Sequence, residues 1–109
     1  MSEEARLRES LVLHGRSLYE RALSPGSSGN LSARLLDGLL VTPTGSCLGR
    51  LEPQQISRVD GNGRHLDGDP PSKEAFLHLA MYRERPEAGA VVHLHSTHAV
   101  ALACLADVD

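Results

Sequence analysis

The stretch that decides the expected fold is PSKEAFLHLAMYRERPEAGAVVHLHSTH, residues 71–98. Apolar side chains at Phe76, Leu79 and Ala80 recur at helical spacing, which predicts a helix with one buried face. Proline and glycine in the following PEAG segment end that helix, because neither residue favours its continuation. The next residues, 90–95, are mostly apolar and predict a buried strand. The stretch therefore predicts a helix, a turn and a strand.

Two histidines lie two residues apart on this predicted strand. Because successive strand side chains point to opposite faces, His93 and His95 are expected to point the same way. Two neighbouring imidazoles suit a divalent metal such as zinc, and Glu74 could supply a carboxylate. The alternative is that the two histidines only line a polar sheet face. The strand is otherwise apolar, so two imidazoles on one face need partners, and we favour a metal site.

Composition limits the classes of function. The chain has 109 residues, of which 40% are apolar and 3% aromatic, as expected for one small globular domain or part of one. A formal net charge of −3 gives no reason to expect nucleic acid as a partner. No apolar run is long enough to cross a membrane, and the charged N-terminus lacks the apolar core of a signal peptide. Cys47 and Cys104 form no C-x-x-C motif, so we expect reduced thiols in a cytoplasmic protein.

The rest of the chain predicts an amphipathic N-terminal helix followed by short strands and turns. We expect these elements at residues 3–22 (helix), 31–35, 39–42, 56–59 and 64–66 (strands), 51–55 (helical turn) and 97–105 (helix). An Asp-Gly pair at 37–38 predicts a hairpin between the first two strands.

The other histidines carry no supporting pattern. We therefore expect several of them, together with one tyrosine, at the surface: His14, Tyr19, His65 and His78. His98 could complete a metal site only if the strand continued through Ser96. We expect Ser96 to cap the last helix instead, which would turn His98 elsewhere.

Two loops rich in small polar residues flank the predicted strands, SPGSSGN at 24–30 and PTGS at 43–46. Glycine and asparagine permit positive φ, and backbone N–H groups in such loops can form an anion-binding nest. Neither loop is a Walker A motif, because no Gly-Lys-Ser/Thr follows. We expect Ser72 to cap the next helix, whose N-terminus favours an anion, and Lys73 adds positive charge there. Taken singly, such loops are mostly simple turns, and most lysines are solvated. If the two loops and the start of the helix lie together in the fold, they would form a phosphate-binding pocket.

Four segments together resemble the class II aldolase/adducin family: GSSGNLSAR at 26–34, TPTGSCLG at 42–49, GDPPSKE at 68–74 and AVVHLHSTH at 90–98. They occur in order and with matched gaps along nearly the whole chain. The resemblance implies a three-layer α/β/α fold around a central, mostly antiparallel sheet. It also implies a homo-oligomer, usually a tetramer, with sites between subunits.

The resemblance carries over to individual positions. It implies that substrate phosphate is bound by Gly29, Asn30, Thr44, Gly45, Ser72 and Lys73. It implies that Glu74 is the catalytic acid/base and also a metal ligand, and that His93 and His95 are zinc ligands. Where many relatives have serine, this chain has Lys73, as the decarboxylating members do.

The family's domain is longer than this chain, so residues 1–109 are expected to form the N-terminal part of one such domain. The family's third histidine ligand lies in the other half. We therefore expect the isolated chain to be inactive, to bind zinc weakly and to expose an unpaired sheet edge.

The function implied is that of a metal-dependent carbon–carbon lyase acting on a phosphorylated sugar acid. Decarboxylation of a 3-oxo acid to dihydroxyacetone phosphate and carbon dioxide is favoured. The alternatives are an aldolase or epimerase acting on a similar sugar phosphate, as in fuculose-phosphate aldolase or ribulose-phosphate 4-epimerase, and a non-enzymatic, adducin-like interaction domain. The predicted metal ligands Glu74, His93 and His95 argue against an adducin-like interaction domain, because such a domain does not need a metal site.

Overall fold

The computed structural model describes residues 1–95, which form two α-helices and one five-stranded sheet. The helices are α1 (Glu3–Glu20) and α2 (Ala75–Glu84), and two short 3-10 turns span Leu48–Arg50 and Pro53–Gln55. The strands are β1 (Asn30–Leu35), β2 (Gly38–Val41), β3 (Ser57–Asp60), β4 (His65–Asp67) and β5 (Ala90–His93). The strand order is β4-β3-β2-β1-β5, and every neighbouring pair is antiparallel.

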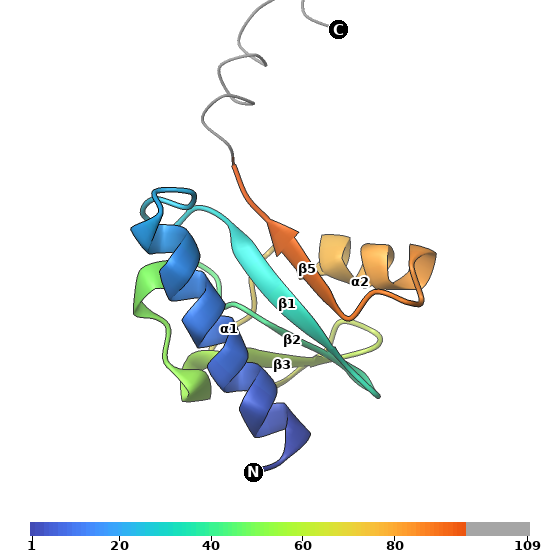
Figure 1. The fold of residues 1–109 in the computed structure, drawn as a ribbon. Coiled ribbons are helices and arrows are strands. Elements are labelled where there is room, and N and C mark those ends of the chain that lie inside the picture. The colour runs from blue at the N-terminus through green and yellow to red at the C-terminus, as the bar shows by residue number, and fades with distance from the viewer. Residues whose placement is uncertain (96–109) are drawn as a thin grey trace, which may run out of the picture.

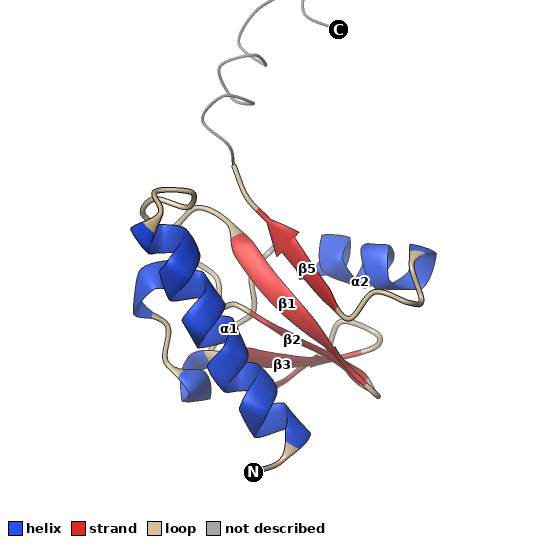
Figure 2. Ribbon diagram, viewed as in Figure 1, coloured by secondary structure: helices blue, strands red, loops and turns tan. Residues whose placement is uncertain are grey.

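The two helices lie on opposite faces of the sheet, with α1 across one face and α2 against the other (Figures 1 and 2). The predicted three-layer α/β/α class is therefore confirmed. Every strand predicted within residues 1–95 is present, with ends within two residues of the predicted ones. The predicted helix at 97–105, its cap Ser96 and His98 lie outside the described residues.

The face covered by α1 is mostly apolar, with the buried Arg8 as a charged exception that donates to the carbonyls of Pro53 and Ile56. Ser2 accepts a hydrogen bond from the Ala5 N–H at 3.1 Å and caps the helix, while the first-turn residues Glu3 and Glu4 suit its positive end. One buried cluster joins α1, the sheet and the two 3-10 turns: Leu11, Leu31, Ala33, Leu40, Leu48, Leu51 and Ile56. This cluster is the larger apolar core of the described residues.

The face covered by α2 mixes apolar and polar side chains. Its apolar cluster consists of Leu39, Val41, Val59, Tyr82 and Val91. Beside it, Asn30 and Ser32 alternate along β1 with the residues that face α1, so both point toward α2. This face therefore presents hydrogen-bonding groups to the helix.

The orientation of α2 corrects two predictions. Phe76 is 64% exposed and Ala80 is also exposed, so they do not form the buried face, although Leu79 packs on the core. The fully inward residues are His78 and Tyr82, and His78, predicted at the surface, is only 1% exposed. Apolar periodicity predicted the wrong buried face of α2. The sheet presents Asn30 and Ser32 to the helix, so polar helix side chains that can hydrogen-bond to them are buried there.

Strand β5 is less buried than predicted. It pairs with β1 on one side and forms an edge of the sheet within residues 1–95. Val91 is buried toward α2, but Val92 on the opposite face is 60% exposed. The strand ends at His93, so His95 follows it. Within the described residues, no helix combines the length and apolar character needed to span a membrane.

Candidate metal and phosphate site

Glu74, His93 and His95 come together at one end of the sheet. Glu74 immediately precedes α2, and His93 is the last residue of β5. One potential ligand atom from each side chain lies within 4.8 Å of the others. The Nδ1 atom of His93 is 3.5 Å from Oε2 of Glu74, and the two imidazole centroids are 5.1 Å apart.

Backbone pairing explains this convergence. In the antiparallel register of β1 with β5, His93 lies opposite Asn30. The segment before α2 is tied to the end of β2, because the Ser72 N–H donates to the Thr42 carbonyl at 3.1 Å and the Thr44 N–H donates to the Pro70 carbonyl at 3.0 Å. The start of α2 is thus held beside the ends of β1 and β5.

The donor set fits a divalent cation. Two imidazoles and a carboxylate are ligands typical of catalytic zinc, which keeps one further position open for water or substrate. Glu74 and His93 are half-buried, and His95 is exposed, so the cluster is open on one side. The side chains therefore combine suitable ligand chemistry with access for a small molecule.

All six residues expected to bind phosphate line one open pocket of about 270 Å³. They are Gly29, Asn30, Thr44, Gly45, Ser72 and Lys73, and the same pocket is lined by Glu74 and His95. Gly29 has a φ of +80°, and a Cβ atom there would lie 2.8 Å from Ser24 Oγ. Gly45 has a φ of +68°. Both loops therefore need glycine at these turns.

Sequence reasoning missed a buried polar group behind this pocket. Asn30 donates from Nδ2 to Oε1 of Glu74 at 3.1 Å, and its Oδ1 atom accepts a hydrogen bond from Nε2 of His78. Ser32 Oγ lies 2.6 Å from Nδ1 of His78 and 2.7 Å from the Tyr82 hydroxyl. The spacing of His78 and Tyr82, four residues apart on one helix, was the available signal.

Burial sets the charge states of this group. It lowers the pKa of His78 to about 4, with a smaller contribution in the same direction from His93 and an opposing one from Glu74. Burial also raises the pKa of Tyr82, against the opposing effects of its hydrogen bond with Ser32 and of the nearby Arg34. At neutral pH both side chains are therefore uncharged.

The fold and site define a class of protein. The family described as Class II Aldolase and Adducin N-terminal domain matches residues 9–109, and the chain belongs to this family. A protein of Escherichia coli (strain K12) named 3-oxo-tetronate 4-phosphate decarboxylase is 53% identical over 107 residues, covering 97% of this chain and 50% of the relative.

Solved structures agree with this assignment. YgbL from Escherichia coli matches with a TM-score of 0.91 and 50% identity, covering 99% of this chain and 53% of that chain. An L-fuculose 1-phosphate aldolase matches with a TM-score of 0.84 and 32% identity, covering 95% of this chain and 50% of that chain. The chain thus spans about half the length of the curated relatives it matches.

Proposed function

We propose that the complete protein carrying this sequence is a divalent-metal-dependent carbon–carbon lyase that converts 3-oxo-tetronate 4-phosphate to dihydroxyacetone phosphate and carbon dioxide. In this proposal, residues 1–109 form the N-terminal part of one family domain. The observation that carries the proposal is the position of Glu74, His93 and His95 at the same pocket as the glycine loops. The identity to a relative named for this reaction supports the choice of substrate.

The two loops would hold the phosphate of the substrate. The backbone N–H groups of the positive-φ residues Gly29 and Gly45 are suited to bind phosphate oxygens, whereas the neighbouring N–H groups of Ser28, Thr44 and Ser46 donate to protein carbonyls. Ser72 offers a hydroxyl, and the exposed ammonium of Lys73 offers a full positive charge at the pocket. Anchoring the phosphate would direct the other end of the substrate toward Glu74 and the two histidines.

Chemistry would occur at C2 of the substrate. When bound to Glu74, His93 and His95, the metal supplies Lewis acidity that stabilises negative charge on the substrate's 3-oxo oxygen. Breaking the C1–C2 bond releases carbon dioxide and leaves the electron pair on C2, conjugated with the carbonyl. Glu74, released from the metal and protonated from solvent, would then deliver that proton to C2, which completes dihydroxyacetone phosphate.

Metal identity and assembly belong to the same proposal. We expect zinc, because two imidazoles and a carboxylate are typical of its catalytic sites. We expect a homo-oligomer, a tetramer by analogy with the family. The edge that β5 leaves unpaired within residues 1–95 would be available to further strands of the same domain. In residues 1–109 alone, only two metal ligands, the imidazoles of His93 and His95, would remain while Glu74 transfers a proton. We therefore expect this part of the protein to be inactive by itself.

An aldolase is the second candidate, because the same pocket could serve cleavage of a different carbon bond and a fuculose-phosphate aldolase shares the fold. The test is to purify the complete protein with its metal and offer 3-oxo-tetronate 4-phosphate and L-fuculose 1-phosphate separately. Release of carbon dioxide from the first, without aldehyde from the second, supports the decarboxylase. The reverse pattern supports the aldolase, and neither product would reject both candidates.

A further inference from the structure

We infer that His78 is a positioning residue, which fixes the side-chain amide of Asn30 and, through it, the carboxylate of Glu74. The inference deepens the proposed function, since it rests on the proposed role of Glu74. His78 does not line the phosphate pocket, and its hydrogen bond toward that pocket is to Asn30.

The hydrogen bonds run in a single direction when followed from Glu74. An ionised carboxylate can only accept, so Asn30 must present its NH₂ group to Glu74 and its carbonyl oxygen to His78. That oxygen can only accept, so Nε2 of His78 must carry the proton. In the neutral imidazole Nδ1 is then an acceptor, which leaves Ser32 as the donor to it.

Tyr82 fixes the other end of this series of hydrogen bonds. Ser32 Oγ uses its proton toward His78, so it accepts from the Tyr82 hydroxyl. We call this sequence of hydrogen bonds, Tyr82 to Ser32 to His78 to Asn30 to Glu74, the polar relay.

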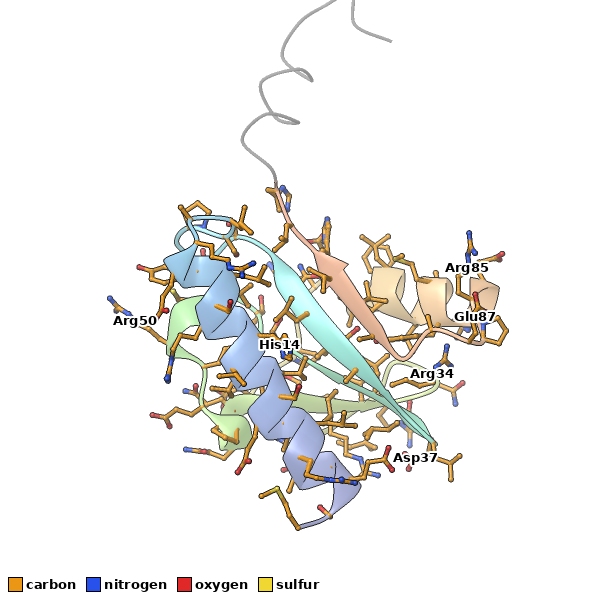
Figure 3. All side chains as sticks on the ribbon, in the orientation of Figure 1. His14, Arg34, Asp37, Arg50, Arg85 and Glu87 are labelled. Atoms are coloured by element: carbon orange, nitrogen blue, oxygen red, sulfur yellow. The ribbon has the colours of Figure 1, made fainter. Side chains whose placement is uncertain are left out.

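The polar relay is anchored in the protein interior. Ser32 and His78 are each 1% exposed and Tyr82 is 5% exposed. The guanidinium of Arg34 lies 4.5 Å from the centroid of the Tyr82 ring and donates to the Tyr82 carbonyl at 2.9 Å. Arg34 also donates to the carbonyls of Ala88 and Arg85, at the end of the molecule where Figure 3 labels Arg34, Arg85 and Glu87.

This anchoring would select one orientation of Asn30. A half-turn of its amide would set NH₂ against the Nε2–H of His78 and oxygen against the carboxylate of Glu74, so two favourable contacts would become repulsive. With a proton on Nδ1, His93 adds to the selection, because that atom lies 3.3 Å from the same Asn30 oxygen. Oε1 of Glu74 is thereby occupied, while Oε2 faces His93. Such outer contacts orient the groups that touch substrate or metal.

The competing view is that His78 only fills space under the sheet. His78→Leu keeps apolar volume but removes the donor, whereas His78→Gln keeps an amide N–H near the position of Nε2. In the complete protein, we expect His78→Leu to lower kcat about 10–100-fold with little change in KM, and His78→Gln to recover most of that loss. Phe76→Leu, on the exposed side of α2, is the matched control and should leave kcat unchanged.

A second readout does not depend on turnover. In the metal-free complete protein, ¹⁵N NMR should show His78 as the neutral Nε2–H tautomer. The Asn30 side-chain amide resonance should shift in His78→Leu and return toward its wild-type position in His78→Gln. The Nδ1–H tautomer, or an Asn30 resonance and kcat both unaffected by His78→Leu, would overturn the inference.

The two proposals can fail separately. If the wild-type protein releases neither carbon dioxide nor aldehyde, the proposed function fails, and the NMR measurements still decide whether His78 orients Asn30. If His78→Leu does not fold, the tautomer of the wild-type protein and the kcat of His78→Gln decide the inference.

Discussion

The two faces of the sheet differ in what their buried side chains do. Toward α1 the buried cluster is apolar, as with Leu11 and Leu40, and the buried Arg8 beside it bonds to backbone carbonyls rather than to the site. Toward α2 the apolar cluster is interrupted by Ser32 and His78, which are as deeply buried but hydrogen-bonded to each other. The α1 face contributes mainly hydrophobic stabilisation, whereas the α2 face also directs polar groups toward Glu74 at the edge of the pocket.

This difference shows how one small sheet can separate stability from chemistry. A buried polar group costs free energy unless it is paired, so the side chains behind Glu74 stay inside only because each finds a partner. Changes to the polar side chains of the α2 face should therefore affect turnover as well as stability, whereas changes on the α1 face should affect stability alone. The three predictions below test that separation in the complete protein.

The largest effect is expected for Glu74→Gln. The substitution keeps the size of the side chain and an oxygen that can accept from Asn30, but it removes the group proposed to transfer a proton. We expect kcat to fall about 1,000-fold, equivalent to about 4 kcal/mol in the activation barrier, with KM and the unfolding midpoint nearly unchanged. Steady-state kinetics and urea titration measure these quantities, and an unchanged kcat would exclude Glu74 as the acid/base.

A somewhat smaller effect, of the opposite kind, is expected for Leu40→Ala. Leu40 is fully buried on the α1 face, so the truncation should leave a cavity and lower the free energy of unfolding by about 3 kcal/mol. Because no polar contact to Glu74 is lost, kcat per folded molecule should stay at the wild-type value. Leu36→Ala is the matched control, since Leu36 is fully exposed in the β1–β2 turn and should change stability by less than about 0.5 kcal/mol. Loss of kcat in folded Leu40→Ala would show that the two faces are coupled.

The smallest effect is a pH dependence of stability caused by His78. Its pKa is about 4 in the folded protein, against 6.5 for an unperturbed histidine, so the unfolded chain binds the extra proton first as the pH falls. The stability contributed by neutral His78 is therefore complete above the unfolded pKa and is lost as the pH falls toward the folded one. Between about pH 8 and about pH 5 this loss amounts to about 2 kcal/mol.

The contribution of His78 can be isolated by comparison with His78→Gln, which does not titrate. Urea unfolding of both proteins across that pH range gives the difference directly. The wild-type protein should lose about 2 kcal/mol more than the variant on acidification. Parallel curves for the two proteins would contradict the depressed pKa of His78.

Much of the architecture followed from local pattern. Helical periodicity placed α1, and the alternation of short apolar runs with Asp-Gly and glycine-rich turns placed strands β1 to β4 within two residues of their ends. The three-layer class was expected from the family resemblance, and the structure confirms it. The expected phosphate residues and Glu74 were chosen from short motifs, and they line one pocket. Their roles in binding and catalysis stay predictions.

The sequence by itself determined the order of the elements and the residues with functional chemistry, because turn composition and side-chain periodicity act over a few neighbouring residues. Tertiary structure decided which face of α2 turns inward, and it placed Asn30 opposite His93. It also decided that His78 joins Ser32 and Asn30, from a strand more than 40 residues earlier in the chain. Strand register and hydrogen bonds between distant segments depend on how the whole sheet pairs, and the four-residue spacing of His78 and Tyr82 does not say which strand residues they meet.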